Sequence, residues 1–280
     1  MRIGFIGDLH IDYNTHHDFL TALAEACNRL KLDTIVFCGD TLTGAEQALT
    51  FYAKLRSRTN TKVLQIPGNH ELYCLPEQSK NKLCLDADEY MDLMLNDERT
   101  SLFKNPIVHG QWCIIGGPSW YDYSLHRNYR RMDALAKRRF LHRNPEYKYL
   151  QDKKESPFIN EKITAKSLML MERQLRTIRE REKGKHYKIC SVIHMLPLAE
   201  MYKSSHVWAT TVAFMGSKYY AELYETYGVD LCICAHSHLR RSLTKNGTTY
   251  VNVSLGHNFK WKHKTNLYSE LLETIYVLEI

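Results

Sequence analysis

The N-terminal stretch MRIGFIGDLH, residues 1–10, decides the fold. Its apolar run ends in a glycine, an aspartate and a histidine, a pattern typical of a buried strand followed by a polar loop. The pattern returns in TIVFCGD at residues 34–40 and in KVLQIPGNHE at residues 62–71. Because helix-like periodicity fills the gaps between these strands, the sequence predicts an α/β domain built from right-handed crossovers.

The same signals extend along the rest of the chain. Apolar runs predict strands at Arg2–Gly7, Thr34–Cys38, Lys62–Ile66, Trp112–Gly116, Tyr187–Ile193, Val229–Cys234, Thr248–Val253 and Thr274–Leu278. Periodic apolar residues predict helices at His17–Leu30, Ala45–Arg56 and Asp86–Asn96. No helix is expected between the last three strands, and Lys245, Asn246 and Gly247 predict a hairpin. We therefore expect a mixed sheet system.

Size and composition are those of a globular protein. The chain has 280 residues, of which 44% are hydrophobic and 25% charged, so it can bury a core of its own. No apolar run reaches the roughly 18 to 20 residues that cross a bilayer, and no export signal is evident, so we expect a cytoplasmic protein with no membrane partner. The eight cysteines are scattered without a CxxC pair, which indicates reduced, packed thiols.

The net charge of +7 is concentrated in one segment. Residues 123–188 contain 19 Lys and Arg against 8 Asp and Glu. Residues 119–187 also break the strand rhythm, and we interpret them as a basic helical insertion, or cap, within a single domain of residues 1–280, with helices near 128–143 and 161–183. The insertion clusters Arg130-Arg131 and Lys137-Arg138-Arg139 could attract phosphate-bearing substrates, contact a nucleic acid or form a solvated helix face.

Potential metal ligands follow the carboxyl ends of several predicted strands. Ligands of open α/β sheets bind beyond these ends, so we expect the side chains to converge. They are Asp8, His10, Asp40, Asn69, His194, His236 and His238. Two carboxylates, one amide oxygen and four imidazoles exceed what one divalent cation needs, but they suit two cations that share a bridging carboxylate.

The order and spacing of these residues resemble the signature of the calcineurin-like metallophosphoesterases. The matching blocks are Asp8-x-His10, Gly39-Asp40, Gly68-Asn69-His70-Glu71, His194 and His236-x-His238. Two positions depart from the family pattern, because Ile193 and Ala235 stand where glycine is usual. Neither departure removes a ligand.

This resemblance implies a fold and a set of roles. The fold would be a four-layer αββα sandwich with two mixed central sheets. Asp8, His10 and His238 would hold the first metal, Asp40 would bridge, and Asn69, His194 and His236 would hold the second. His70 would be the catalytic residue that stabilises or protonates the leaving oxygen. A cationic centre disfavours a protonated histidine beside it unless a carboxylate compensates the charge, and Glu71 and Asp12 are both candidates for that carboxylate.

We therefore predict a metal-dependent phosphoric ester hydrolase in which a metal-bridging hydroxide attacks a phosphomono- or phosphodiester. The donor set admits manganese, iron or zinc, and we expect a small phosphoester or nucleotide-like substrate. A nuclease-like enzyme acting on DNA or RNA and a non-catalytic scaffold of the same fold are the alternatives. The aromatic stretch Trp120–Tyr123 either lines the substrate cleft or anchors the insertion.

Overall fold

The computed structural model describes residues 1–74, 86–129, 159–182, 186–202 and 211–280. The insertion expected at 119–187 lies partly outside these ranges. The helix predicted near 128–143 begins at the edge of the described part, and both insertion clusters fall beyond it. The helix predicted at 161–183 corresponds to α6 (Ile159–Glu180).

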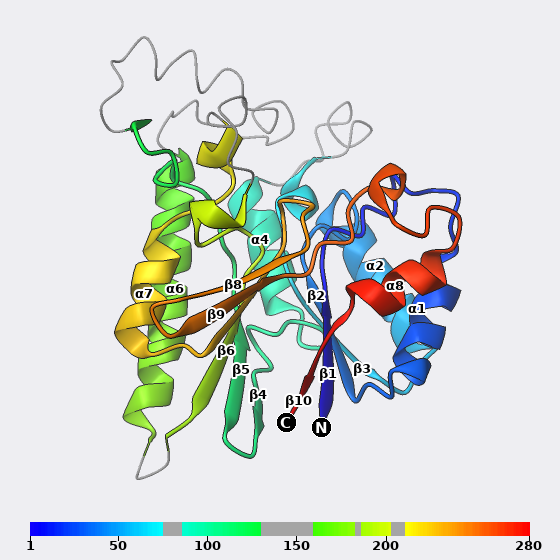
Figure 1. Ribbon diagram of the computed structural model, residues 1–280, viewed down its shortest axis with the longest axis horizontal. Helices are drawn as coiled ribbons and strands as arrows, with labels where there is room; N and C mark the ends of the chain where they lie inside the picture. The colour runs from blue at the N-terminus through cyan, green and yellow to red at the C-terminus, as the bar shows by residue number, and fades with distance from the viewer. Residues whose placement is uncertain (75–85, 130–158, 183–185, 203–210) are drawn as a thin grey trace.

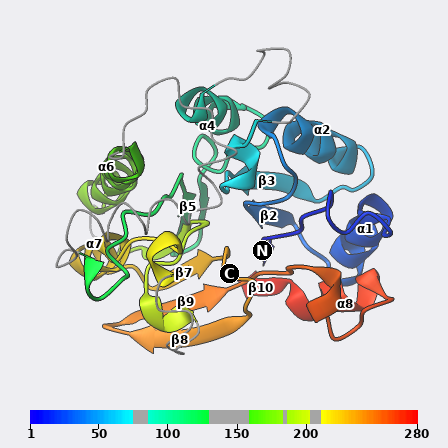
Figure 2. The same cartoon turned by 90° about the horizontal axis from the view of Figure 1, so that it is seen from above.

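Two sheets face each other at the centre of the molecule, with helices on both outer sides (Figures 1 and 2). The first sheet has the strand order β10-β1-β2-β3, and the second has the order β4-β5-β6-β7-β9-β8. The strands of the two sheets are β1 (Arg2–Ile6), β2 (Thr34–Cys38), β3 (Lys62–Ile66), β4 (Ile107–His109), β5 (Trp112–Gly116), β6 (Lys188–Val192), β7 (Leu231–Cys234), β8 (Arg241–Lys245), β9 (Thr248–Asn252) and β10 (Tyr276–Glu279). Antiparallel β10, β4 and β8 make both sheets mixed, as predicted.

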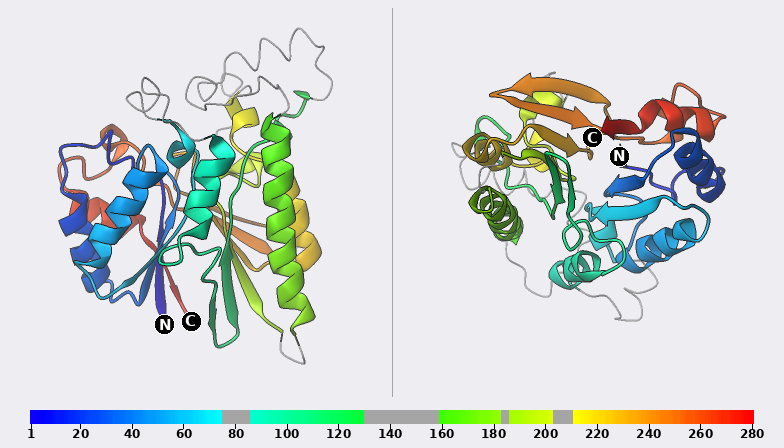
Figure 3. Two further views of the ribbon diagram at one scale, coloured as in Figure 1. Left: turned by 180° about the vertical axis from the view of Figure 1, so that it is seen from behind. Right: turned by 90° about the horizontal axis from the view of Figure 1, so that it is seen from below.

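Helices cover the outer face of each sheet (Figures 2 and 3). Those over the first sheet are α1 (Phe19–Arg29), α2 (Ala45–Arg56), α4 (Ala87–Asn96) and α8 (Leu267–Thr274). Those over the second sheet are α6 and α7 (Tyr219–Tyr227). The expected four-layer sandwich is confirmed.

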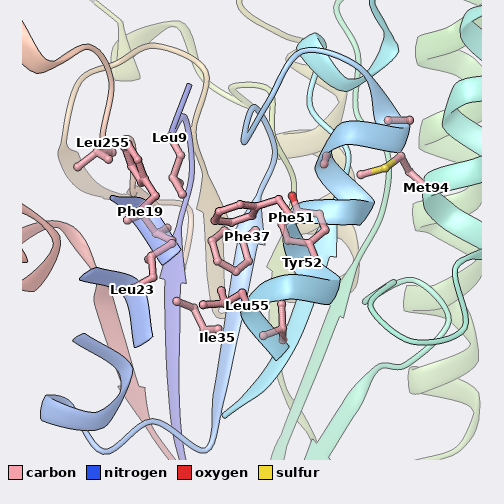
Figure 4. Packing of buried hydrophobic residues seen from close by; sticks show 14 of the residues in the cluster. Leu9, Phe19, Leu23, Ile35, Phe37, Phe51, Tyr52, Leu55, Met94 and Leu255 are labelled. Atoms are coloured by element: carbon pink, nitrogen blue, oxygen red, sulfur yellow. The ribbon is translucent and has the colours of Figure 1, made fainter. Parts of the chain in front are cut away.

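Side-chain alternation along the strands explains the layers, since successive residues of a strand point to opposite faces. In β2, Val36 and Cys38 belong to the core between the two sheets, whereas Phe37 belongs to the core beneath the helices. There it packs against Phe51 and Tyr52 of α2, with ring centroids 6.4 and 5.1 Å away (Figure 4). Strands buried on both faces are apolar throughout, which is why the sequence predicts them well.

Three elements differ from the sequence prediction. The prediction of no helix between the last strands is wrong, because α8 lies between β9 and β10. This short helix is capped by Asn266, whose side chain accepts from the Ser269 amide, and it buries Leu267 and Leu271. The strands β4 and β8 were not predicted, because β4 has three residues and β8 is largely exposed. The β8–β9 hairpin is confirmed, with positive φ at Asn246 and Gly247.

The cysteines follow the prediction except at one position. Six are free and buried in the described part of the chain: Cys27, Cys38, Cys113, Cys190, Cys232 and Cys234. Cys74 is disulfide-bonded, so the expectation of reduced thiols is wrong there. The free ones lie within helices and strands, whereas Cys74 follows η1 (His70–Leu72) outside regular structure. Every helix in the described ranges is too short or too polar to cross a membrane.

Candidate metal centre

Loops at the carboxyl ends of five strands bring the predicted ligands together. Potential ligand atoms of Asp8, His10 and His238 lie within 4.8 Å of one another, and so do those of Asp40, His194 and His236. The seventh predicted ligand joins the second group, because Asn69 Oδ1 lies 3.0 Å from His194 Nε2. We refer to these seven side chains as the metal centre.

Asp40 lies between the two groups of the metal centre. Its Oδ2 atom is 3.4 Å from His194 Nε2 in the second group and 3.8 Å from His10 Nε2 in the first. The carboxylate is almost fully buried. A side chain in this position can contact two cations at once.

Five residues of the metal centre have a left-handed backbone. The φ angles are 55° at Asp8, 43° at His10, 55° at Asp40, 68° at His236 and 53° at His238. Non-glycine residues in this region cost about 1–3 kcal/mol each and persist only where surrounding structure holds them, which is often at functional sites. Here the amides of Asp8 and His10 donate to the carbonyls of Gly39 and Asp40, at 3.0 Å each. The backbone strain therefore coincides with the predicted ligands.

The glycines before the ligands serve two purposes. Gly39 has a φ of 84°, as expected for a sharp turn. Gly68 instead permits close approach, because a Cβ there would lie 2.2 Å from Asp40 Oδ1. A Cβ on Gly7 would lie 2.6 Å from Cβ of Ala235. Gly7 and Gly68 therefore serve close packing, and Gly7 provides the space that accommodates Ala235.

Backbone carbonyls fix the orientation of two imidazoles. His194 Nδ1 lies 2.8 Å from the Cys38 carbonyl, and His236 Nε2 lies 3.2 Å from the Phe214 carbonyl. A carbonyl only accepts, so each of these nitrogens carries the proton. The other nitrogens, His194 Nε2 and His236 Nδ1, face each other at 3.2 Å inside the metal centre. Such outer contacts commonly orient metal-binding histidines.

The charges of the metal centre favour a cation. Burial would raise the pKa of Asp40, but His194 and then His70 outweigh it and hold that pKa well below its usual range. Burial would lower the pKa of His194, but the carboxylates of Asp40 and Asp8 raise it to about 10. Burial, with His194 nearby, lowers the pKa of His236 to about 4, so its lone pair stays available. The carboxylates thus attract positive charge that a metal ion can supply in place of a proton.

The residues present fit metal ions. Asp8 Oδ2 is buried and has no hydrogen-bond partner within the described residues, which is costly for a carboxylate oxygen unless a cation binds it. His10 Nε2 and His238 Nε2 are only 2.9 Å apart. Burial lowers the pKa of His238 to about 4, so this imidazole is neutral at pH 7. Mixed carboxylate, amide and imidazole donors are typical of manganese, iron and zinc sites.

His70 borders the metal centre and is partly open to solvent. Its Nε2 atom lies 3.9 Å from Asp40 Oδ2, and 19% of its side chain is exposed. Neither of the two carboxylates considered for His70 is its partner. Glu71 accepts hydrogen bonds from the amides of Asp40, Thr41 and Gly68, and Asp12 accepts from Thr43. The carboxylate that faces His70 is therefore Asp40.

Glu71 and Tyr73 have supporting roles that the sequence did not reveal. Glu71 is fully buried, and burial together with Asp40 raises its pKa to about 7. Its three accepted hydrogen bonds connect the loops that follow β2 and β3. Tyr73 Oη accepts a 2.7 Å hydrogen bond from Asn69 Nδ2, which turns Asn69 Oδ1 toward the metal centre. No local pattern predicts this contact, although Tyr73 is only four residues from Asn69.

The three rings of the stretch Trp120–Tyr123 are buried, and two of them are hydrogen-bonded to α6. Trp120, Tyr121 and Tyr123 are all 0% exposed. Trp120 Nε1 donates to Asn160 Oδ1 at 2.8 Å, and Asn160 Nδ2 donates to Tyr123 Oη at 2.6 Å. These bonds attach the start of α6 to the loop after β5. The interpretation as a substrate-lining surface is therefore wrong.

Comparison with known proteins gives the family. A family model of the calcineurin-like phosphoesterases matches residues 1–240, which include every residue of the metal centre. The chain belongs to this family. It is accordingly a metal-dependent phosphoric ester hydrolase that uses two metal ions. No curated protein sequence matched in a separate search.

Solved structures share the fold of this calcineurin-like phosphoesterase. One is phosphopantetheinyl hydrolase from Mycobacterium tuberculosis, with a TM-score of 0.73, 18% identity and coverage of 99% of this chain and 95% of that chain. Another is a dimetal phosphatase from Danio rerio, with a TM-score of 0.53, 16% identity and coverage of 90% and 86%. At these identities the likeness concerns the fold.

Proposed function

We propose that the protein hydrolyses a small phosphoester, with Asp8, His10 and His238 holding one cation, Asn69, His194 and His236 holding the other, and Asp40 bridging. The observation that carries this proposal is the position of Asp40 Oδ2, 3.4 Å from His194 Nε2 and 3.8 Å from His10 Nε2. When bound, two such cations supply an activated water and neutralise phosphate oxygens. Manganese, iron and zinc all suit the donors.

In this proposal the chain's own residues orient the substrate and move a proton. His70 lies at the solvent-facing edge of the centre, where an ester oxygen can leave. Its imidazole donates a proton or hydrogen bond to that oxygen, while its backbone amide donates to Asp40 Oδ1 at 2.9 Å. The same residue thus connects the leaving group to the bridging carboxylate.

The substrate class we favour is a phosphodiester or nucleotide-like molecule. Support comes from the basic composition of residues 119–187, which we propose form a cap within a single domain. The phosphopantetheinyl hydrolase is a structural neighbour, so a phosphopantetheinyl ester belongs among the substrates to test. Hydrolysis of DNA or RNA would favour the nuclease alternative instead. The scaffold alternative conflicts with seven competent donors in one centre.

The test is a panel of phosphomonoesters, phosphodiesters, nucleotides and nucleic acids, assayed with manganese, iron and zinc in turn. We expect metal-dependent hydrolysis of a small ester, and Asp40→Asn should abolish it and lower the metal content at both sites, measured by elemental analysis. Asp97→Asn is the control, because this carboxylate caps a turn at Thr100 away from the centre. Full metal occupancy in Asp40→Asn would contradict the bridging assignment.

A further inference from the structure

Three aromatic rings extend from the metal centre to the surface. His257 stacks on His10, with ring centroids 5.2 Å apart and planes at 27°. Phe259 in turn stacks on His257, with ring centroids 5.6 Å apart and planes at 13°. Tyr13 meets His257 edge-on at 5.7 Å and also contacts the rings of His10 and His70, at 5.8 and 5.9 Å. Aromatic groups therefore connect the predicted ligand His10 and the proposed acid His70 with solvent.

The outer rings of this set are unusually exposed. Tyr13 is 58% exposed and Phe259 is 64% exposed, and they are among the few large hydrophobic residues at the surface of the described structure. Exposed aromatic rings gathered beside a polar site commonly mark a binding surface. Lys260 adds a positive charge at the same edge, with Nζ 5.6 Å from the Phe259 ring centroid. A ligand that carries both an aromatic ring and a negative charge would match the exposed rings and the positive charge of Lys260.

Buried hydrogen bonds hold these rings in place. Asn14 is 1% exposed, and its Nδ2 atom donates to the carbonyls of Leu9 and Gly256, at 2.8 and 3.2 Å. Its Oδ1 atom accepts from the amide of Asn258 at 3.0 Å. Asn14 thus ties the loop that carries His10 to the loop that carries His257 and Phe259. In Figure 1 the orange segment after β9 runs beside the dark blue loop after β1.

We propose that Tyr13, His257 and Phe259 form an aromatic subsite that binds a planar ring of the phosphoester and so determines substrate specificity. The subsite rests on the proposed function, since its ligand is the organic part of the same substrate. His257 and Phe259 lie beyond residue 240, where the match to the family model ends. Tyr13 lies within the matched residues, so the subsite joins a loop of the matched region to a loop beyond it. A pre-ordered surface favours stacking because little side-chain freedom is lost on binding.

The test compares two ligands that differ only in the ring, phenylphosphonate and methylphosphonate. Their binding to the metal-loaded full chain is measured by titration calorimetry, which does not require turnover. We expect the wild type to bind phenylphosphonate more tightly. Phe259→Ala and Tyr13→Ala should each lower the affinity for phenylphosphonate about two- to ten-fold, the factor expected from one aromatic pair. Methylphosphonate affinity should change less than about two-fold by the same reasoning.

Two controls separate ring recognition from general damage. Phe259→Tyr keeps the ring and should keep the preference for phenylphosphonate. Met169→Ala removes another exposed apolar side chain, 61% exposed on α6, and should change neither affinity. Equal weakening of both phosphonates, or no weakening, overturns the subsite. Failure of the proposed function is a separate result, seen as absence of metal-dependent hydrolysis of any phosphoester by the wild type.

Discussion

Removal of a single oxygen atom tests how the second cation is held. Tyr73→Phe deletes the hydroxyl that accepts from Asn69 Nδ2 at 2.7 Å, at a residue that is only 6% exposed. The Asn69 amide loses the contact that points Oδ1 toward His194 Nε2, 3.0 Å away. A buried donor left without a partner costs about 1–3 kcal/mol. Removing a hydrogen bond that orients a metal ligand typically lowers metal affinity by about 10- to 100-fold, which is roughly 1.4–2.8 kcal/mol.

The assay is a competition titration with a chelator, analysed for two sites. We expect the affinity of the site assigned to Asn69 to fall by about 10- to 100-fold while the other site keeps its affinity. Tyr224→Phe is the matched control, because its hydroxyl is also buried but accepts from Ser191 in the opposite half of the molecule. Unchanged affinity at both sites, or equal weakening of both, would refute the reasoning.

Two further substitutions examine the chemistry and the packing of the centre. His70→Ala should slow turnover by about 10²- to 10⁴-fold, the usual contribution of a general acid, with metals still bound in elemental analysis; an unchanged turnover number would assign His70 a structural role only. Gly68→Ala places a Cβ 2.2 Å from Asp40 Oδ1, so overpacking should lower the free energy of unfolding by about 1–3 kcal/mol in urea titrations. Gly117→Ala, whose Cβ would meet its nearest neighbour at 3.5 Å, should be tolerated, and similar losses in both variants would disprove the packing argument.

The sequence predicts the central strands well because their burial leaves a local signature. Thr34–Cys38 is buried at every residue, and both ends of β2 agree with the prediction. In β8 the Arg241–Lys245 strand is mostly exposed, so it lacks that signature. The eight residues of α8 are too few for helical periodicity to emerge clearly. An element is thus predicted well from the sequence when it is long enough and buried enough to show a clear hydrophobic pattern.

The metal centre shows the same distinction. The convergence of its seven side chains could be predicted because each is a metal-binding residue type near the end of a strand, in the order of a known family. Tyr73 and His257 carry no such mark, since their roles depend on contacts made after folding. His257 gains its place by stacking on His10, a residue far away in the sequence. Gly256 has a φ of 71° and lies against His238, so a side chain at this position would be strained and crowded. This requirement for glycine becomes visible only in the folded chain.

The pairing of β10 with β1 affects how the protein matures during translation. β1 leaves the ribosome well before β10, the strand that pairs with its edge, because the two lie far apart in the sequence. The amides of Leu255 and Gly256 also donate to the carbonyls of Gly7 and Asp8. A nascent chain therefore carries an open strand edge on β1 until β10 emerges, and such edges are prone to aggregate. Asp8, a proposed metal ligand, therefore reaches its final backbone geometry only after the segment that carries Gly256 has emerged.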